Sequence, residues 1–541
     1  MSPGFKLREM CQPYWDASAA LQPTVRLSRR DYTLWKPTPE EISDRLGWLD
    51  LPQAMHSGIL ELEDFVEDVR SRRFRHVVLL GMGGSSLCAE VMRATFDGRE
   101  TFPTLHVLDS TVPAWVARQT AAIDPAHTLF LVASKSGETI EVMSFYKHFR
   151  ALVEKTKGAA AGENFAAITD PATPLETLAA EEGFMHAFIN PSNVGGRYSA
   201  LSHFGLVPCA VMGLNVGELL SRAREMSRAC GVVFPVEENP GAWLGMVAGC
   251  MARAGRNKLT IVTSPSIHAF GLWAEQLIAE STGKEGSGIV PIVHEPRGDL
   301  SAYAQDRLFV YLRLATDDNA DTDAWVKGIE KAGLPVLRPE LRDLYDVGGE
   351  YFRWEFATAV AGACLRINPF NQPNVKESKD NTSRVLADCK GGKGLPPLCD
   401  EGDFGDLIES VRPGDYLAIL SYTDRTDEGE RAIHELRSAL LRDRKLPTTH
   451  GYGPRYLHST GQLHKGGANN GLFLQITQDN ESDVPIPGEE YTFGTLAAAQ
   501  AIGDFEALKA HDRRVARIHL KRGETLQGRL QMLREMVGRR R

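Results

Sequence analysis

The chain has 541 residues, which is too long for one ordinary hydrophobic core, so two or three domains are expected. Hydrophobic residues make up 43% of it and charged residues 24%, as in soluble globular proteins. The formal net charge of -9 creates no field that would attract nucleic acid, and no apolar run reaches the roughly 18 residues needed to cross a bilayer. We therefore expect no nucleic-acid partner and no membrane insertion.

The N-terminus and the cysteines favour a cytoplasmic location. The first stretch, MSPGFKLREMCQPYWDAS, lacks the apolar core of a signal peptide. The eight cysteines include no C-x-x-C pair, in a chain large enough not to need disulfide bonds. They are expected to be free thiols, mostly buried.

Three series of short apolar runs alternate with helical patterns along the chain. The first begins at about residue 75 with HVVLL and continues through TLHVLD, TLFLVAS and FAAITD. The second begins near Leu259 with LTIVTS and reaches RLFVYLRL at residues 307–314, and the third begins with DYLAILSY. Strands that alternate with helices predict parallel sheets with helices on both faces.

The series predict an α/β protein of four segments. An N-terminal segment covers residues 1–55, and two three-layer α/β/α domains cover residues 56–235 and 236–385. A smaller C-terminal α/β segment covers residues 386–541. The boundary near residue 235 lies in CGVVFPVEENPGAW, whose prolines and glycines interrupt the helical pattern.

A glycine turn follows the first predicted strand, in VVLLGMGGSSLCAEVM at residues 77–92. A dinucleotide-binding turn would have a third glycine where Ser86 stands, and a Walker loop would have G-K-[ST]. The unpaired amides at the start of the next helix suit a phosphate group instead. Gly84 and Ser85 are the candidate phosphate-binding residues, although such turns also occur for structural reasons alone.

A second polar turn follows the third predicted strand, in FLVASKSGETIEVM. Its candidate phosphate-binding residues are Ser134, Lys135, Ser136 and Thr139. The alternative is an ordinary helix cap with Glu138 near the positive helix end. Both turns fall at the carboxyl edge of one parallel sheet, where such sheets bind ligands, so the sequence predicts one monophosphate site.

GMGGSS and SKSGET together resemble the SIS (sugar isomerase) fold, whose turns bind the phosphate of a phosphosugar. Three further stretches narrow the resemblance to the phosphoglucose isomerase family: NVGGRYSALSHFG at 193–205, EQLIAESTGKEG at 275–286 and FNQPNVKESK at 370–379. LWKPTPEEISDRLGWL and HSTGQLHKGG are similar to the isomerase half of bacterial transaldolase–phosphoglucose isomerase fusions, and the chain shows no room for the transaldolase half.

The resemblance implies two SIS-type domains and an enzyme without cofactor that interconverts glucose 6-phosphate and fructose 6-phosphate in glycolysis and gluconeogenesis. The reaction would open the sugar ring and pass through a cis-enediol(ate), and the enzyme would be a homodimer. No metal-binding spacing is present, so no metal is expected. The alternatives are a mannose-6-phosphate or dual-specificity isomerase and a non-catalytic, sugar-phosphate-binding SIS regulator.

Isomerisation needs a base that reaches two neighbouring carbons and a cation that stabilises the developing oxyanion. By resemblance, Glu280 is the base, Arg197 stabilises the intermediate and Lys379 assists ring opening. From the residues alone, Glu280 and Lys284 would fit a surface pair four residues apart on a helix. The resemblance also implies three substrate-binding residues: Gly196, Gln276 and Gln372.

The family opens the ring with a histidine, commonly within TNGQH downstream of the glutamate, and that motif is missing here. HSTGQLHKGG resembles it through TGQ. We expect His464 to be the catalytic histidine and His458 to be the second choice. His294 lies in the expected interval but in a different context.

Overall fold

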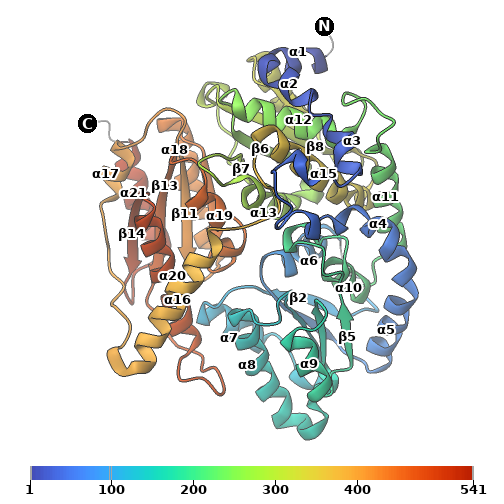
Figure 1. Cartoon of the computed structure of the whole chain (residues 1–541). Coiled ribbons are helices and arrows are strands. Elements are labelled where there is room, and N and C mark those ends of the chain that lie inside the picture. The colour runs from blue at the N-terminus through green and yellow to red at the C-terminus, as the bar shows by residue number, and fades with distance from the viewer. Residues whose placement is uncertain (1–2, 97, 99, 539–541) are drawn as a thin grey trace.

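The computed structural model describes residues 3–538 apart from residues 97 and 99. It contains three parallel β-sheets surrounded by helices, which confirms the α/β fold class (Figure 1). In Figure 1 the first sheet lies at the bottom, the second above it and the third, in orange and red, beside both.

Short helices of the N-terminal part cover the first two sheet layers. They are α1 (Pro3–Glu9), α2 (Gln12–Ala19), α3 (Pro23–Ser28), α4 (Leu51–Ala54) and the longer α5 (Ile59–Ser71). Trp15 of α2 packs edge-on against Trp243, with ring centroids 5.3 Å apart, so this segment shares the core of the second domain.

The first sheet has the strand order β2-β1-β3-β4-β5. Its strands are β1 (His76–Gly81), β2 (Thr104–Leu108), β3 (Thr128–Ala133), β4 (Phe165–Thr169) and β5 (His186–Ile189). The helices between them are α6 (Leu87–Thr95), α7 (Pro113–Ala121), α8 (Ile140–Lys157) and α9 (Pro174–Glu181). Because β2 lies on one side of β1 and β3 on the other, the crossover direction reverses there, which opens a crevice at the carboxyl edge.

The second sheet has the order β10-β8-β6-β7, and β9 also pairs with β8. Its strands are β6 (Lys258–Thr263), β7 (Val290–Ile292), β8 (Arg307–Leu314), β9 (Val336–Leu337) and β10 (Glu340–Leu341). The accompanying helices are α11 (Val216–Ala229), α12 (Pro240–Arg253), α13 (Phe270–Thr282), α14 (Ala320–Lys331) and α15 (Val347–Leu365). Helix α10 (His203–Val211) packs instead against α5 and α6 of the first sheet layer.

Helices α12 and α15 pack closely in the centre of the largest core. A Cβ atom added at Gly245 of α12 would lie 2.3 Å from the Ala357 carbonyl of α15, and one added at Gly249 would lie 2.6 Å from Cys364 Cβ. Glycine at both positions therefore lets the helix backbones approach.

The prediction that most cysteines are buried free thiols is confirmed, with Cys389 and Cys399 the more accessible ones.

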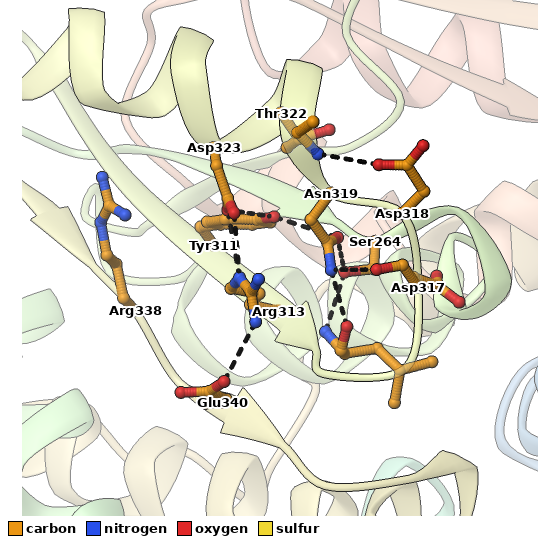
Figure 2. Close-up of polar contacts among 12 residues, drawn as sticks. Ser264, Tyr311, Arg313, Asp317, Asp318, Asn319, Thr322, Asp323, Arg338 and Glu340 are labelled. Atoms are coloured by element: carbon orange, nitrogen blue, oxygen red, sulfur yellow. Dashed lines mark hydrogen bonds and ion pairs between the residues drawn. The ribbon is translucent and has the colours of Figure 1, made fainter.

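Side chains fill the carboxyl edge of the second sheet, as Figure 2 shows. Asn319 is 3% exposed; its amide donates to the Leu314 carbonyl at 2.7 Å, and its side-chain oxygen accepts from Ser264 Oγ and Tyr311 Oη. Arg313 then joins Asp323 to this edge. The polar side chains named here therefore form hydrogen bonds with one another and with the backbone at this edge. The corresponding edge of the first sheet carries the two predicted phosphate turns.

The third sheet has the order β12-β11-β13-β14. Its strands are β11 (Tyr416–Tyr422), β12 (Thr448–Tyr452), β13 (Gly471–Gln478) and β14 (Arg514–Leu520). Its helices are α17 (Phe404–Glu409), α18 (Asp427–Arg444), α19 (Gly461–Gly466), α20 (Phe493–Ala510) and α21 (Leu526–Gly538).

Helix α16 (Val375–Asp388) links the second and third segments and packs along α20 (Figure 1). The expected boundary between residues 385 and 386 falls inside this helix.

Among the described residues, none of the helices combines the length and the apolar character that a membrane span requires.

Candidate active site

The two polar turns lie side by side because β1 and β3 are neighbours. Gly81, the last residue of β1, is opposite Ala133, the last residue of β3, so the chain leaves both strands at the same level. Gly83 has φ of +53°, and a Cβ there would lie 2.6 Å from the His458 carbonyl. Only glycine combines that backbone conformation with so close an approach.

Together with residues from the second and third segments, the turns line a cavity of about 490 Å³. It is lined by the following candidate residues: Gly84, Ser85, Lys135, Ser136, Thr139, Gly196, Arg197, Gln276, Glu280, Gln372 and Lys379. Ser134 is not part of the lining. Its hydroxyl accepts from the Gly137 amide at 3.1 Å and bonds Thr139 Oγ1 at 2.9 Å, so it shapes the second turn from within.

Glu280 stands in the last turn of α13 and is 6% exposed. Its Oε1 lies 3.4 Å from Arg197 Nη1, and its Oε2 accepts from Gln276 Nε2 at 3.1 Å. Gln276 Nε2 also donates to the His458 carbonyl at 2.7 Å. The carboxylate is thus held from two sides while it faces the cavity.

Arg197 is oriented by groups on the side away from the cavity. Its Nε donates to Ser281 Oγ at 2.8 Å, and its Nη2 donates to the carbonyls of Pro369 at 2.8 Å and Asn371 at 2.9 Å. These bonds leave Nη1 directed at Glu280. The guanidinium is therefore fixed by protein groups alone, which is the arrangement that stabilises charge in a transition state.

Lys284 does not form a surface pair with Glu280. It is 1% exposed, and its Nζ donates to the Asn371 carbonyl at 2.5 Å and to Asn371 Oδ1 at 3.0 Å. Burial, with the nearby Arg197 charge, holds the pKa of Lys284 well below its ordinary value. Lys284 and Arg197 share the Asn371 carbonyl, so Lys284 supports the loop that orients Arg197.

The structure places the two candidate histidines differently from the sequence expectation. His464 is 2% exposed and packs against Phe473, with ring centroids 5.0 Å apart, inside the core of the third segment. Burial holds the pKa of His464 well below its ordinary value. The preference for His464 is therefore corrected: α19 directs its side chain away from the cavity, and His458 lies in the cavity wall instead. His294 bonds the His268 carbonyl at 2.9 Å and is not among the lining residues.

His458 is paired with a carboxylate that the sequence interpretation missed. It ends the short turn η13 (Arg455–His458) after β12, and its Nε2 lies 2.9 Å from Glu141 Oε1. Burial alone would raise the pKa of Glu141, but the charge and hydrogen bond of His458 outweigh it and lower that pKa. A buried carboxylate so paired keeps its negative charge beside the imidazole.

Lys135, in the second turn, bonds the Asp170 carboxylate and donates to the Ser192 carbonyl at 3.3 Å. Asp170, which the sequence interpretation also missed, lines the cavity, and burial raises its pKa despite the lysine. The signal for it was present, because Asp170 directly follows β4 at the same carboxyl edge.

Among the described residues, no three His, Cys, Asp or Glu side chains gather as a metal site.

Gly84 allows the first turn to touch the loop that carries Arg197, and this generates a prediction. A Cβ at Gly84 would lie 2.1 Å from the Gly196 carbonyl, whereas one at Gly195 would meet only atoms at 3.9 Å or more. Gly84→Ala should force the turn and the loop apart and weaken binding of the expected ligand, glucose 6-phosphate, by at least about tenfold, or about 1.4 kcal/mol. Isothermal titration calorimetry measures this, with Gly195→Ala as the matched control. Equal affinities of the two variants would show that this contact does not shape the site.

Comparison with known proteins shows similarity to one family over part of the chain. Residues 59–294 match the family model described as phosphoglucose isomerase. Glucose-6-phosphate isomerase of Carboxydothermus hydrogenoformans is 29% identical over 397 residues, which cover 63% of this chain and 85% of that protein. Glucose-6-phosphate isomerase of Parabacteroides distasonis is 29% identical over 394 residues, which cover 64% and 87%.

Two solved structures share the fold over most of their length. A hypothetical protein from Thermus thermophilus has a TM-score of 0.59 and 25% identity, and the match covers 70% of this chain and 97% of that one. A glucose-6-phosphate isomerase from Chlamydia trachomatis has a TM-score of 0.58 and 18% identity, with 71% and 87% covered. Residues 59–294 thus match the phosphoglucose isomerase family model, and the chain shares the fold of these two solved structures.

Proposed function

We propose that this protein is an aldose–ketose isomerase that interconverts D-glucose 6-phosphate and D-fructose 6-phosphate, a step of glycolysis and gluconeogenesis. One observation carries the proposal: a buried carboxylate, Glu280, faces a fixed guanidinium, Arg197, in a cavity that the two polar turns also line. The family relatives bear the name of this activity. No observation favours a mannose-6-phosphate isomerase or a non-catalytic regulator.

Glu280 transfers the proton between the two carbons. Its carboxylate takes the proton from C2 of the open-chain aldose, and the electrons move to the C1 oxygen. The enediol(ate) passes the proton of its C2 hydroxyl to the C1 oxygen, and the protonated Glu280 carboxyl returns its proton to C1. Arg197 Nη1, held beside Glu280, stabilises the negative charge that develops on the oxygen. Gln276 keeps the carboxylate in the orientation that reaches both carbons.

The phosphate group binds where the two turns meet. Ser85, Ser136 and Thr139 supply hydroxyl donors, and the first turn of α8 supplies backbone amides with a partial positive charge. Lys135 supplies an ammonium group, which the Asp170 carboxylate holds at the cavity wall. Binding at this end places the sugar carbons toward Glu280.

His458 and Lys379 open the ring. Both line the cavity, and each has a side chain able to exchange a proton with the ring oxygen or the C1 hydroxyl. Glu141 bonds the His458 imidazole and fixes its orientation. This assignment replaces His464 as the catalytic histidine.

We propose, further, that the protein is a homodimer, as the family resemblance implies. The loop after α11 exposes two adjacent valines, Val232 at 46% and Val233 at 81%, and apolar patches of this kind are often covered by partners. Sedimentation velocity should give twice the chain mass of 59.6 kDa. Val233→Asp should shift the protein toward monomer, while Leu60→Asp, at another exposed apolar residue, should not. A monomeric wild-type protein would contradict the proposal.

Glu280→Gln tests the catalytic base. The substitution keeps the size of the side chain but removes its ability to accept a proton, so turnover should fall by about 10²–10⁴-fold. A coupled assay of fructose 6-phosphate conversion measures it, with EDTA present throughout. Binding of glucose 6-phosphate, measured by calorimetry, should remain within a few-fold. A variant that keeps most of its turnover would remove Glu280 as the base, and an inactive wild-type protein would refute the function.

His458→Asn and His464→Asn distinguish the two candidate histidines. Both are made in the Glu280→Gln background, where exchange between the α and β anomers of glucose 6-phosphate reports ring opening without isomerisation. Magnetisation-transfer NMR should show about 10²-fold slower exchange for His458→Asn and little change for His464→Asn. Thermal unfolding of each variant confirms that it is folded. Slower exchange only in the His464 variant would make His464 the catalytic histidine after all.

A further inference from the structure

A row of buried hydrogen bonds continues beyond the His458–Glu141 pair. Glu141 Oε1 accepts a second hydrogen bond from Gln500 Nε2 at 2.7 Å. Gln500 Oε1 in turn accepts from Thr111 Oγ1 at 2.8 Å. Glu141 is 3% exposed, Gln500 is 2% exposed and Thr111 is 0% exposed, so water does not substitute for these contacts.

The row fixes which way the Gln500 amide points. An ionised carboxylate can only accept hydrogen bonds, so the NH₂ group of Gln500 has to face Glu141. The carbonyl end then faces the Thr111 hydroxyl, which has a proton to donate. A reversed amide would place two acceptors together at Glu141 and cost the buried carboxylate a donor.

The second hydrogen bond constrains a torsion that is otherwise loose. Rotation of a glutamate carboxylate about χ3 has a broad energy profile, so one hydrogen bond from His458 leaves its plane poorly defined. Gln500 donates to the same oxygen as His458 and limits that rotation. Because glutamine is neutral, it adds a donor without adding a charge that would compete with the imidazole for Glu141.

These residues come from different parts of the chain. Thr111 follows β2 and Glu141 lies in the first turn of α8, both in the first domain, whereas Gln500 lies in the middle of α20 in the third segment. Helix α20 also packs along α16, which carries Lys379 (Figure 1). One helix of the C-terminal segment therefore supports both groups assigned to ring opening.

We propose that Gln500 is a positioning residue for ring opening, held by Thr111 and acting through Glu141 on His458. The inference rests on the proposed function. Gln500 also borders a neighbouring cavity of about 300 Å³, which shares His458 and Lys379 with the active site. Because both ends of its amide are already bonded to protein, its role is to orient Glu141 and not to bind substrate.

Gln500→Met tests this role, because methionine keeps the shape of the side chain and removes its donor. The matched control is Gln475→Met in the same segment. Gln475 is 0% exposed, donates to the Ala501 carbonyl at 2.9 Å and accepts from Arg517 at 2.7 Å, but it does not contact Glu141. Each variant thus loses one buried side-chain amide, but only the amide of Gln500 contacts Glu141.

The first measurement is anomer exchange of glucose 6-phosphate by NMR in the Glu280→Gln background. Gln500→Met should slow exchange by about 10–100-fold, as misplacement of a catalytic group does, while the affinity for glucose 6-phosphate stays within about twofold. Gln475→Met should leave exchange unchanged. In the otherwise wild-type protein, Gln500→Met should lower kcat and leave KM nearly unchanged.

Thr111→Val provides a second variant that removes only the hydroxyl, should Gln500→Met fail to fold. It frees the Gln500 amide to rotate, so exchange should slow in the same direction and to a smaller extent. Equal effects of Gln500→Met and Gln475→Met, or weaker binding with unchanged exchange, would overturn the proposal. Unchanged exchange in Thr111→Val would overturn the part assigned to Thr111.

Crystal structures of the two methionine variants separate this inference from the proposed function. If the wild-type protein neither isomerises the sugar nor exchanges its anomers, the proposed function fails. The positioning role is then judged on the Glu141–His458 contact, which is 2.9 Å in the wild-type structure. Loss of that contact in Gln500→Met alone would support it, and an unchanged contact would overturn it.

Discussion

The active site depends on keeping Glu280 and Arg197 charged and facing each other where little water reaches them. Buried charges cost several kcal/mol each unless other groups replace the water they lose. Arg197 receives that replacement from Ser281 and from the carbonyls of Pro369 and Asn371, and Glu280 receives it from Gln276. For the pair to exist, three segments must therefore meet at one place: the loop before α16, the last turns of α13 and the loop with Gly195 and Gly196 that carries Arg197.

This requirement explains why three sheets contribute to one cavity in different ways. The first sheet opens at its carboxyl edge, where the neighbouring strands β1 and β3 end together and leave two helix N-termini free for an anion. In the second sheet, the network around Asn319 fills the carboxyl edge. This part of the chain contributes instead the C-terminal end of α13, the helix that connects β6 to β7. The third segment contributes the turn that carries His458 and the helix that carries Gln500.

Much of the proposed phosphate-binding end of the site could be predicted from local sequence. A strand, a polar turn and a helix start occupy consecutive residues, so GMGGSS and SKSGET indicate their structure without knowledge of the rest of the chain. Ser134 shows the limit of such a prediction, because a hydroxyl in a turn can bond a ligand or the turn itself. Here it bonds Gly137 and Thr139 of its own turn.

The sequence by itself determined the α/β class and the two polar turns, and resemblance implied the roles of Glu280 and Arg197. These features follow from short-range periodicity or from motifs read within one stretch. Only the tertiary structure favoured His458 over His464, because it places His458 in the cavity wall with Glu141 and Gln500 behind it. The physical reason is that two histidines in one stretch carry the same chemistry, and their roles depend on which side chain the packing of α19 and η13 turns toward Glu141 or into the core.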